Sequence, residues 1–264
     1  MKALKKLITV LTLSTLGFAF TSNAALITDW GYNVDTAFTG FAPGAPDVTP
    51  ENNNVVWGAP TKLSWGTSTG QGQSFLEVAG SNGNGNSSGI VDTNGAAAGT
   101  STLTHQNFPI TGSTLMNAVL ESRLTLTPNT PPGGPLPDLD LMFQINFLET
   151  SNDDSCEVVS PVPCNDIFVI DPGGPFNQMF ILDDYSYNVE LLVSGLGPLS
   201  DDACSAVFMA PTTGCRGFTT VEGLVNTFDV SMRITASPIP EPSTILLLGL
   251  AMFGVVANTR SKRS

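Results

Sequence analysis

The only histidine of the chain, His105, stands in the segment Thr104-His105-Gln106-Asn107. Alternate residues of a β-strand face opposite sides, so a strand here places His105 and Asn107 on one face and Thr104 on the other. An imidazole beside a carboxamide can bind a cation or hydrogen-bond a sugar hydroxyl. The same pair can also form a buried polar contact that fixes the strand register. We expect this structural role.

Two tryptophans and three glutamates offer other chemistry. Trp57 and Trp65, in VVWGAPTKLSWG, have flat rings that can stack on sugars, although a Trp-Gly pair near a strand end is more typical of core or edge packing. The carboxylates of Glu149, Glu190 and Glu222 can supply the acid pair of a glycoside hydrolase, whose geometry a sequence does not show. Since there is one histidine and no metal-ligand pattern, we predict no catalytic residue and no enzymatic activity.

Adjacent acidic residues offer hard oxygen ligands of the kind that calcium prefers. None of the pairs shows the spaced pattern of a dedicated calcium loop, so a solvated acidic surface is predicted. We therefore expect no metal site and no cofactor, with calcium as the alternative. The pairs are Asp153-Asp154, Asp183-Asp184 and Asp201-Asp202.

The four cysteines predict two disulfides, because an even number in an exported chain is typical of a disulfide framework. Three pairings are possible. Cys156–Cys164 and Cys204–Cys215 are favoured because each pair brackets a short loop containing proline or glycine. A zinc site is disfavoured since the chain has no C-x-x-C pair and no second histidine.

The elements that must position these residues are strands. Apolar and polar residues alternate in several segments, as they do in antiparallel strands with one wet face. Segments rich in glycine, asparagine and proline separate them, at 80–89 and 128–138. The fold class predicted is all-β, an antiparallel β-sandwich or jelly-roll-like single domain over residues 25–236, with a compact barrel as the alternative. The clearest alternation lies in 120–127, 139–147, 185–193 and 228–234.

The N-terminal residues 1–24 have the three-part pattern of a secretory signal peptide. Three lysines precede an apolar helix-forming run, and small residues follow before a predicted cut after Ala24. Signal peptidase is therefore an expected partner. The alternative is a membrane anchor that is never cut.

The C-terminal residues 237–264 combine a proline-rich linker, an apolar segment at 244–257 and a basic tail. We expect the apolar segment to be a short transmembrane helix. Pro240-Glu241-Pro242 followed by these elements resembles a PEP-CTERM sorting signal. The resemblance implies an exosortase-like partner, an inner-membrane intermediate, and delivery to the cell surface or extracellular matrix of a Gram-negative bacterium. A plain C-terminal anchor is the alternative.

Between the two ends, the chain has only four basic residues but most of its 23 acidic residues. This excess of negative charge repels phosphate groups, so binding to nucleic acid is not expected. The tetrad containing His105 is similar to the one that names the THxN family of PEP-CTERM proteins. The biochemical role of the tetrad in that family is not established. For this chain we expect a non-catalytic structural or binding role at the cell surface or in the matrix, associated with exopolysaccharide. The alternative functions are a carbohydrate-binding module and a carboxylate-pair glycoside hydrolase.

Overall fold

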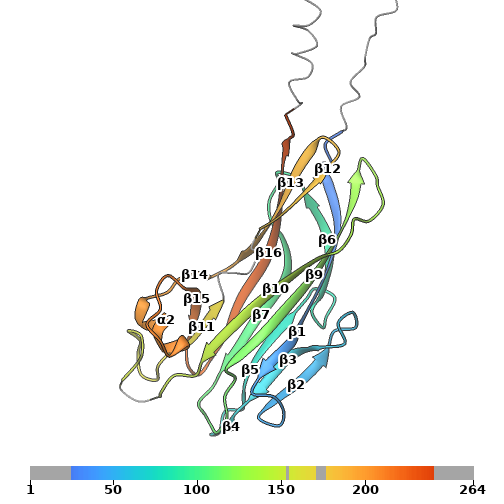
Figure 1. The fold of residues 1–264 in the computed structure, drawn as a ribbon. Helices are drawn as coiled ribbons and strands as arrows, with labels where there is room; N and C mark the ends of the chain where they lie inside the picture. Colours follow the sequence, from blue (N-terminus) through green and yellow to red (C-terminus); the bar gives the residue numbers. More distant parts are fainter. Residues whose placement is uncertain (1–24, 153–154, 171–176, 241–264) are drawn as a thin grey trace, which may run out of the picture.

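A computed structural model describes residues 25–152, 155–170 and 177–240, and it consists mainly of two seven-stranded antiparallel sheets (Figure 1). Sheet A has the strand order β14-β15-β11-β10-β9-β1-β6, and sheet B the order β12-β13-β16-β7-β5-β3-β2. A two-stranded ribbon, β4 (Thr67–Ser68) with β8 (Ile110–Thr111), lies beside them. The prediction of an all-β fold is confirmed.

The strand bounds follow the sheet order. Sheet A contains β14 (Gly197–Pro198), β15 (Arg216–Thr220), β11 (Asp166–Ile170), β10 (Leu139–Leu148), β9 (Asn117–Thr130), β1 (Asp29–Ala42) and β6 (Asn86–Asp92). Sheet B contains β12 (Asn177–Leu182), β13 (Tyr185–Val193), β16 (Leu224–Pro238), β7 (Ala98–Asn107), β5 (Ser74–Ala79), β3 (Pro60–Trp65) and β2 (Val48–Asn53).

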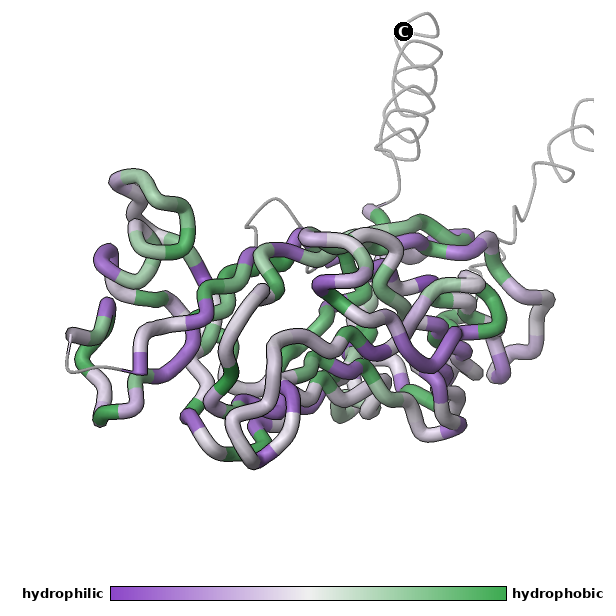
Figure 2. Tube along the Cα trace, turned by 90° about the horizontal axis from the view of Figure 1, so that it is seen from below, coloured by the Kyte–Doolittle hydropathy of each residue, from purple (hydrophilic) through white to green (hydrophobic). Residues whose placement is uncertain are grey.

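Strand β10 shows why these segments form sheets. Phe143, Ile145 and Phe147 are buried, while the residues between them are more exposed. The buried set joins a core cluster that also contains Leu63 and Leu76 of sheet B, so the two sheets pack against one another through their apolar faces. Figure 2 shows hydrophobic and hydrophilic residues interspersed along the chain. This pattern is what a sheet with one buried face requires.

One short helix occurs among the described residues, α2 (Asp201–Phe208). The amide of Ala203 donates to the Ser200 side chain, which caps the first turn, and Met209 ends the helix in the left-handed conformation. A disulfide joins Cys204 of α2 to Cys215 just before β15. The second disulfide, Cys156–Cys164, closes the loop between β10 and β11. Both pairings are those predicted from the sequence.

The two described ends of the chain lie at the same end of the body (Figure 1). The amide of Ile27 donates to the hydroxyl of Tyr187, and Tyr187 pairs with Ala236 near the end of β16. Strand β16 contains 15 residues, so its start lies roughly 50 Å from this end. The predicted signal helix at 1–24 and the predicted transmembrane helix at 244–257 fall outside the described residues. Within the described ranges, no helix is long and apolar enough to cross a membrane.

Candidate functional site

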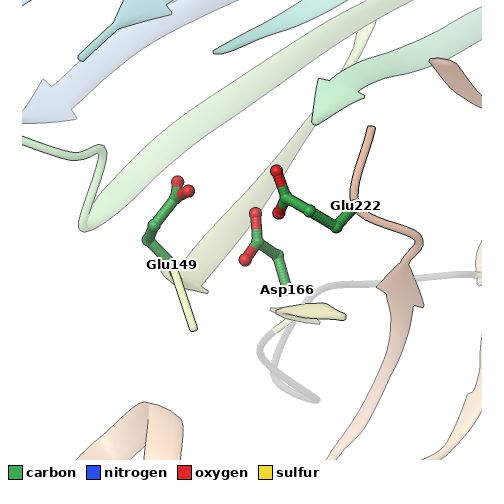
Figure 3. Close-up of side chains that lie close together, drawn as sticks. All are labelled: Glu149, Asp166 and Glu222. Carbon is green, nitrogen blue, oxygen red and sulfur yellow. The ribbon is translucent and has the colours of Figure 1, made fainter. Parts of the chain in front are cut away.

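Three carboxylates far apart in the sequence meet at the end of the body opposite the chain ends (Figures 1 and 3). Glu149 follows β10, Asp166 begins β11, and Glu222 lies in the turn from β15 to β16. One oxygen of each lies within 4.8 Å of the others. Because this turn carries the chain from sheet A to sheet B, the cluster lies where the two sheets meet. We call these three residues the carboxylate cluster.

The carboxylate cluster has few hydrogen-bond donors. The indole Nε1 of Trp65 donates to Glu149 Oε2 at 3.2 Å, and the amide of Thr150 donates to Asp166 Oδ1 at 2.9 Å. The second oxygen of Glu149, that of Asp166 and both oxygens of Glu222 are buried without a hydrogen-bond partner among the described residues. No described lysine or arginine forms an ion pair with the cluster. The ion pairs instead involve Glu51, Asp138, Asp140 and Glu190.

Burial raises the pKa of all three carboxyl groups, and repulsion from neighbouring carboxylates adds to the rise at Glu149 and Asp166. Burial is the main cause of the pKa of about 7 at Glu149, and the charge of Glu222 adds to it. The pKa of Asp166 lies well above its usual range because of burial first and the charge of Glu149 second. Burial also raises the pKa of Glu222, although the nearby Asn107 side chain and Gly223 amide offset part of the rise without making well-aligned hydrogen bonds. A positive charge beside the three groups would favour the ionised form of each of them.

The Thr104–Asn107 tetrad holds the turn that carries Glu222. His105 and Asn107 face inward from β7 and are fully buried, as the predicted strand alternation requires, while Thr104 lies on the other face. The His105 Nδ1 and Thr220 Oγ1 atoms are 2.9 Å apart, and Asn107 Nδ2 donates to the Thr220 carbonyl at 3.1 Å. The Gly223 amide donates to the Asn107 carbonyl at 2.8 Å. The tetrad therefore fixes Thr220, two positions before Glu222, and Gly223, one position after it.

His105 itself lies in an aromatic cage. Its ring stacks on Trp65 at 5.6 Å and meets the edges of Phe147 and Phe168. Burial lowers the pKa of His105 to about 3, so the imidazole is neutral at physiological pH. Its Nε2 has no hydrogen-bond partner in the described part of the chain, and it is not among the ligand atoms that form the 4.8 Å set.

The two tryptophans do not form an exposed sugar platform. Trp65 is completely buried, so the interpretation of its ring as a surface stacking group is wrong; its indole instead supports Glu149. Trp57 is half-buried, donates from Nε1 to the Asp35 carbonyl, and has Arg123 over its ring at 4.7 Å. Each tryptophan thus has a different packing role.

The other predicted acidic residues lie elsewhere. Glu190 pairs with Arg233 between β13 and β16, away from Glu149 and Glu222. Asp201 and Asp202 are exposed in the first turn of α2, and Asp183 begins the turn between β12 and β13. The pair at 153–154 falls outside the described residues.

Asp166 is the member of the cluster that the sequence analysis missed. A signal for it exists in the segment DIFVI, where a carboxylate opens a strand whose five residues are all buried. A charged residue at the head of a continuously buried strand needs a partner, and this requirement marks it as a candidate site residue.

Comparison with known proteins identifies the C-terminal end. The PEP-CTERM protein-sorting motif matches residues 238–263. The motif indicates an exported protein that an exosortase sorts at the membrane for delivery to the cell surface. Of the three predicted sorting residues, Pro240 is the final residue that the structure describes, and Glu241 and Pro242 lie outside the described residues. No curated protein matches the chain. The matched range excludes the tetrad, so the THxN resemblance stays a prediction.

Proposed function

We propose that this chain is a non-catalytic surface or matrix protein, an acidic β-sandwich of jelly-roll type that exosortase delivers and that associates with exopolysaccharide. The observation that carries the proposal is the PEP-CTERM motif directly after β16. The strand that leads into the motif begins at the carboxylate cluster, roughly 50 Å away. The cluster therefore lies at the end of the body that is farthest from the start of the sorting motif.

The chemistry of the body supports a role without catalysis. The sequence Gly66-Thr67-Ser68-Thr69-Gly70 matches the G-x-S-x-G pattern of a nucleophile elbow. However, Ser68 lies in the short ribbon, and its hydroxyl accepts hydrogen bonds from the amides of Gly70 and Gly72. The only imidazole is buried beside Thr220, and its pKa is lowered to about 3, which makes it a weak base at neutral pH.

Sorting is tested by deleting Pro240–Pro242 in a host that makes both exosortase and exopolysaccharide. The deleted protein is expected to remain at the inner membrane with its C-terminal segment uncut, whereas the wild type reaches the surface fraction at a lower mass. Replacing Asn258 and Thr259 by alanine is the matched control, since it changes the tail outside the proline–acid–proline element. Delivery of the deleted protein at the wild-type level and mass would refute the sorting step.

Association with exopolysaccharide is tested in a strain of the same host that lacks polysaccharide synthesis but keeps exosortase. The mature protein is expected to move from the cell-associated matrix into the medium. Equal retention in both strains would show that a different surface component holds the protein.

A further inference from the structure

We propose that the carboxylate cluster, together with the carboxamide oxygen of Asn107, binds one calcium ion that joins the two sheets. The site differs from the adjacent acidic pairs at which the sequence suggested calcium as an alternative. It lies at the end of the body away from the sorting motif, and it is independent of how the protein is sorted. Four side chains carry the proposal: Glu149, Asp166, Glu222 and Asn107.

The spacing of the oxygens fits calcium. Calcium binds oxygen ligands at about 2.3–2.6 Å, so two oxygens on opposite sides of the ion lie about 4.6–5.2 Å apart. The cluster oxygens lie within 4.8 Å of one another, inside this limit. Magnesium binds at about 2.0–2.1 Å, which would require a closer set, and zinc prefers nitrogen and sulfur in a tetrahedron. The ligand set consists of oxygens and excludes His105, which favours the harder and larger ion.

Asn107 provides evidence that does not depend on the acidic residues. Its side chain is completely buried, and its Nδ2 is committed to the Thr220 carbonyl. Its Oδ1 has no hydrogen-bond partner in the described chain, and the Asn107 side chain is close enough to Glu222 for the amide Nδ2 to act on that carboxyl group. A buried carbonyl oxygen without a donor is rare and needs an explanation. A cation bound at the neighbouring carboxylates would give this oxygen a partner.

The charge of the cluster points the same way. Asp166 is completely buried with one free oxygen, and Figure 3 shows its carboxylate between those of Glu149 and Glu222. Buried carboxylates are normally paired with a basic side chain or a metal ion. Lys62, Arg123 and Arg233 form their ion pairs elsewhere, and Arg216 forms none with the cluster, which leaves a divalent cation as the natural counter-charge.

The bound ion would act as a crosslink between the sheets. Glu149 and Asp166 extend from β10 and β11 of sheet A, and Asn107 ends β7 of sheet B. Glu222 lies in the turn that connects the sheets. His105 is then a positioning residue, because its contact with Thr220 fixes the start of this turn without touching the ion.

The test is calorimetric titration of calcium into the processed, disulfide-bonded protein after removal of divalent ions. We expect one calcium per chain with a dissociation constant below about 1 mM, the range of extracellular calcium modules. Magnesium is expected to bind at least tenfold more weakly. Glu222→Gln and Asp166→Asn should each weaken calcium binding at least tenfold. Asp201→Asn with Asp202→Asn is the control, because it removes two exposed charges and should leave the affinity unchanged.

Three outcomes would overturn the proposal. The first is no binding by the wild type at several millimolar calcium. The second is unchanged affinity in Glu222→Gln, which is expected to disturb folding less than Asp166→Asn because Glu222 is only partly buried whereas Asp166 is completely buried. The third is an equal loss in the Asp201 and Asp202 control, which would indicate diffuse binding to an acidic surface. Near-ultraviolet circular dichroism confirms that each variant is folded before titration.

Discussion

Asp35 and Asp166 are both buried carboxylates, and the protein surrounds them in opposite ways. The oxygens of Asp35 accept hydrogen bonds from the side-chain amides of Asn33, Asn54 and Asn86. Asp166 receives both of its hydrogen bonds from Thr150 on a single oxygen, and its neighbours are two further carboxylates. The protein therefore supplies hydrogen-bond donors to both oxygens of Asp35, whereas one oxygen of Asp166 lacks a donor and needs a bound ligand. A structural acid and a binding acid differ in their donors, even when their burial is the same.

The largest expected loss of stability comes from removing Asp35, the carboxylate whose oxygens already have hydrogen-bond donors. Asp35→Ala leaves three amide donors facing a buried space, and we expect the free energy of unfolding to fall by about 3 kcal/mol. Denaturant unfolding measures the change. The loss should be the same in calcium and in chelator, because Asp35 is not part of the carboxylate cluster. A calcium-dependent loss would erase the distinction between the two acids.

Glu149→Gln is expected to change the stability of the fold in opposite directions in chelator and in calcium. In chelator at pH 8 this variant should be as stable as the wild type or more stable, by up to about 1 kcal/mol, because it removes an uncompensated buried charge. In 5 mM calcium it should be less stable by about 1–2 kcal/mol, because the bound ion no longer stabilises the folded state. Thermal unfolding in both buffers gives the two values. Glu190→Gln, at the partly buried ion pair with Arg233, is the control, and its effect on stability should have the same sign in both buffers.

The third prediction tests whether the contact between His105 and Thr220 supports calcium binding as well as stability. Thr220→Val removes the hydroxyl that contacts His105, and we expect a loss of about 1–2 kcal/mol in stability with weaker calcium binding. Thr61→Val is the matched control, since the Thr61 hydroxyl is also buried and donates to the Asn52 carbonyl. It should cost similar stability and leave the calcium affinity unchanged. Equal affinities in the two variants would show that the tetrad only stabilises the fold.

Sequence patterns reveal the strands whose alternation is clean. β10, β13 and most of β16 follow from period-two hydrophobicity alone. β1 was not predicted, because polar Asp35 and Thr36 are buried within it and a bulge near Phe38 shifts its register. Helix α2 was also missed, although Ser200 followed by two aspartates is a start signal for a helix. Local patterns fail where polar residues take buried positions.

The candidate site was only partly predictable for a related reason. Glu149 and Glu222 were named from composition, and the shared face of His105 and Asn107 follows from strand geometry. Their meeting with Asp166 depends on the pairing of β10 with β11 and of β11 with β15, which brings together residues far apart in the chain. The disulfide pairs, by contrast, close short loops and could be predicted locally.

The most direct test of the account is sensitised luminescence of terbium(III), an ion that replaces calcium on oxygen ligands. Trp65 donates to Glu149, so a terbium ion in the cluster would be excited through this indole. The account predicts emission on tryptophan excitation that calcium displaces, that Trp65→Phe removes and Trp57→Phe retains, and that Glu222→Gln weakens strongly. Emission that survives in both Trp65→Phe and Glu222→Gln, or no emission from the wild type, would contradict a cation site between the sheets.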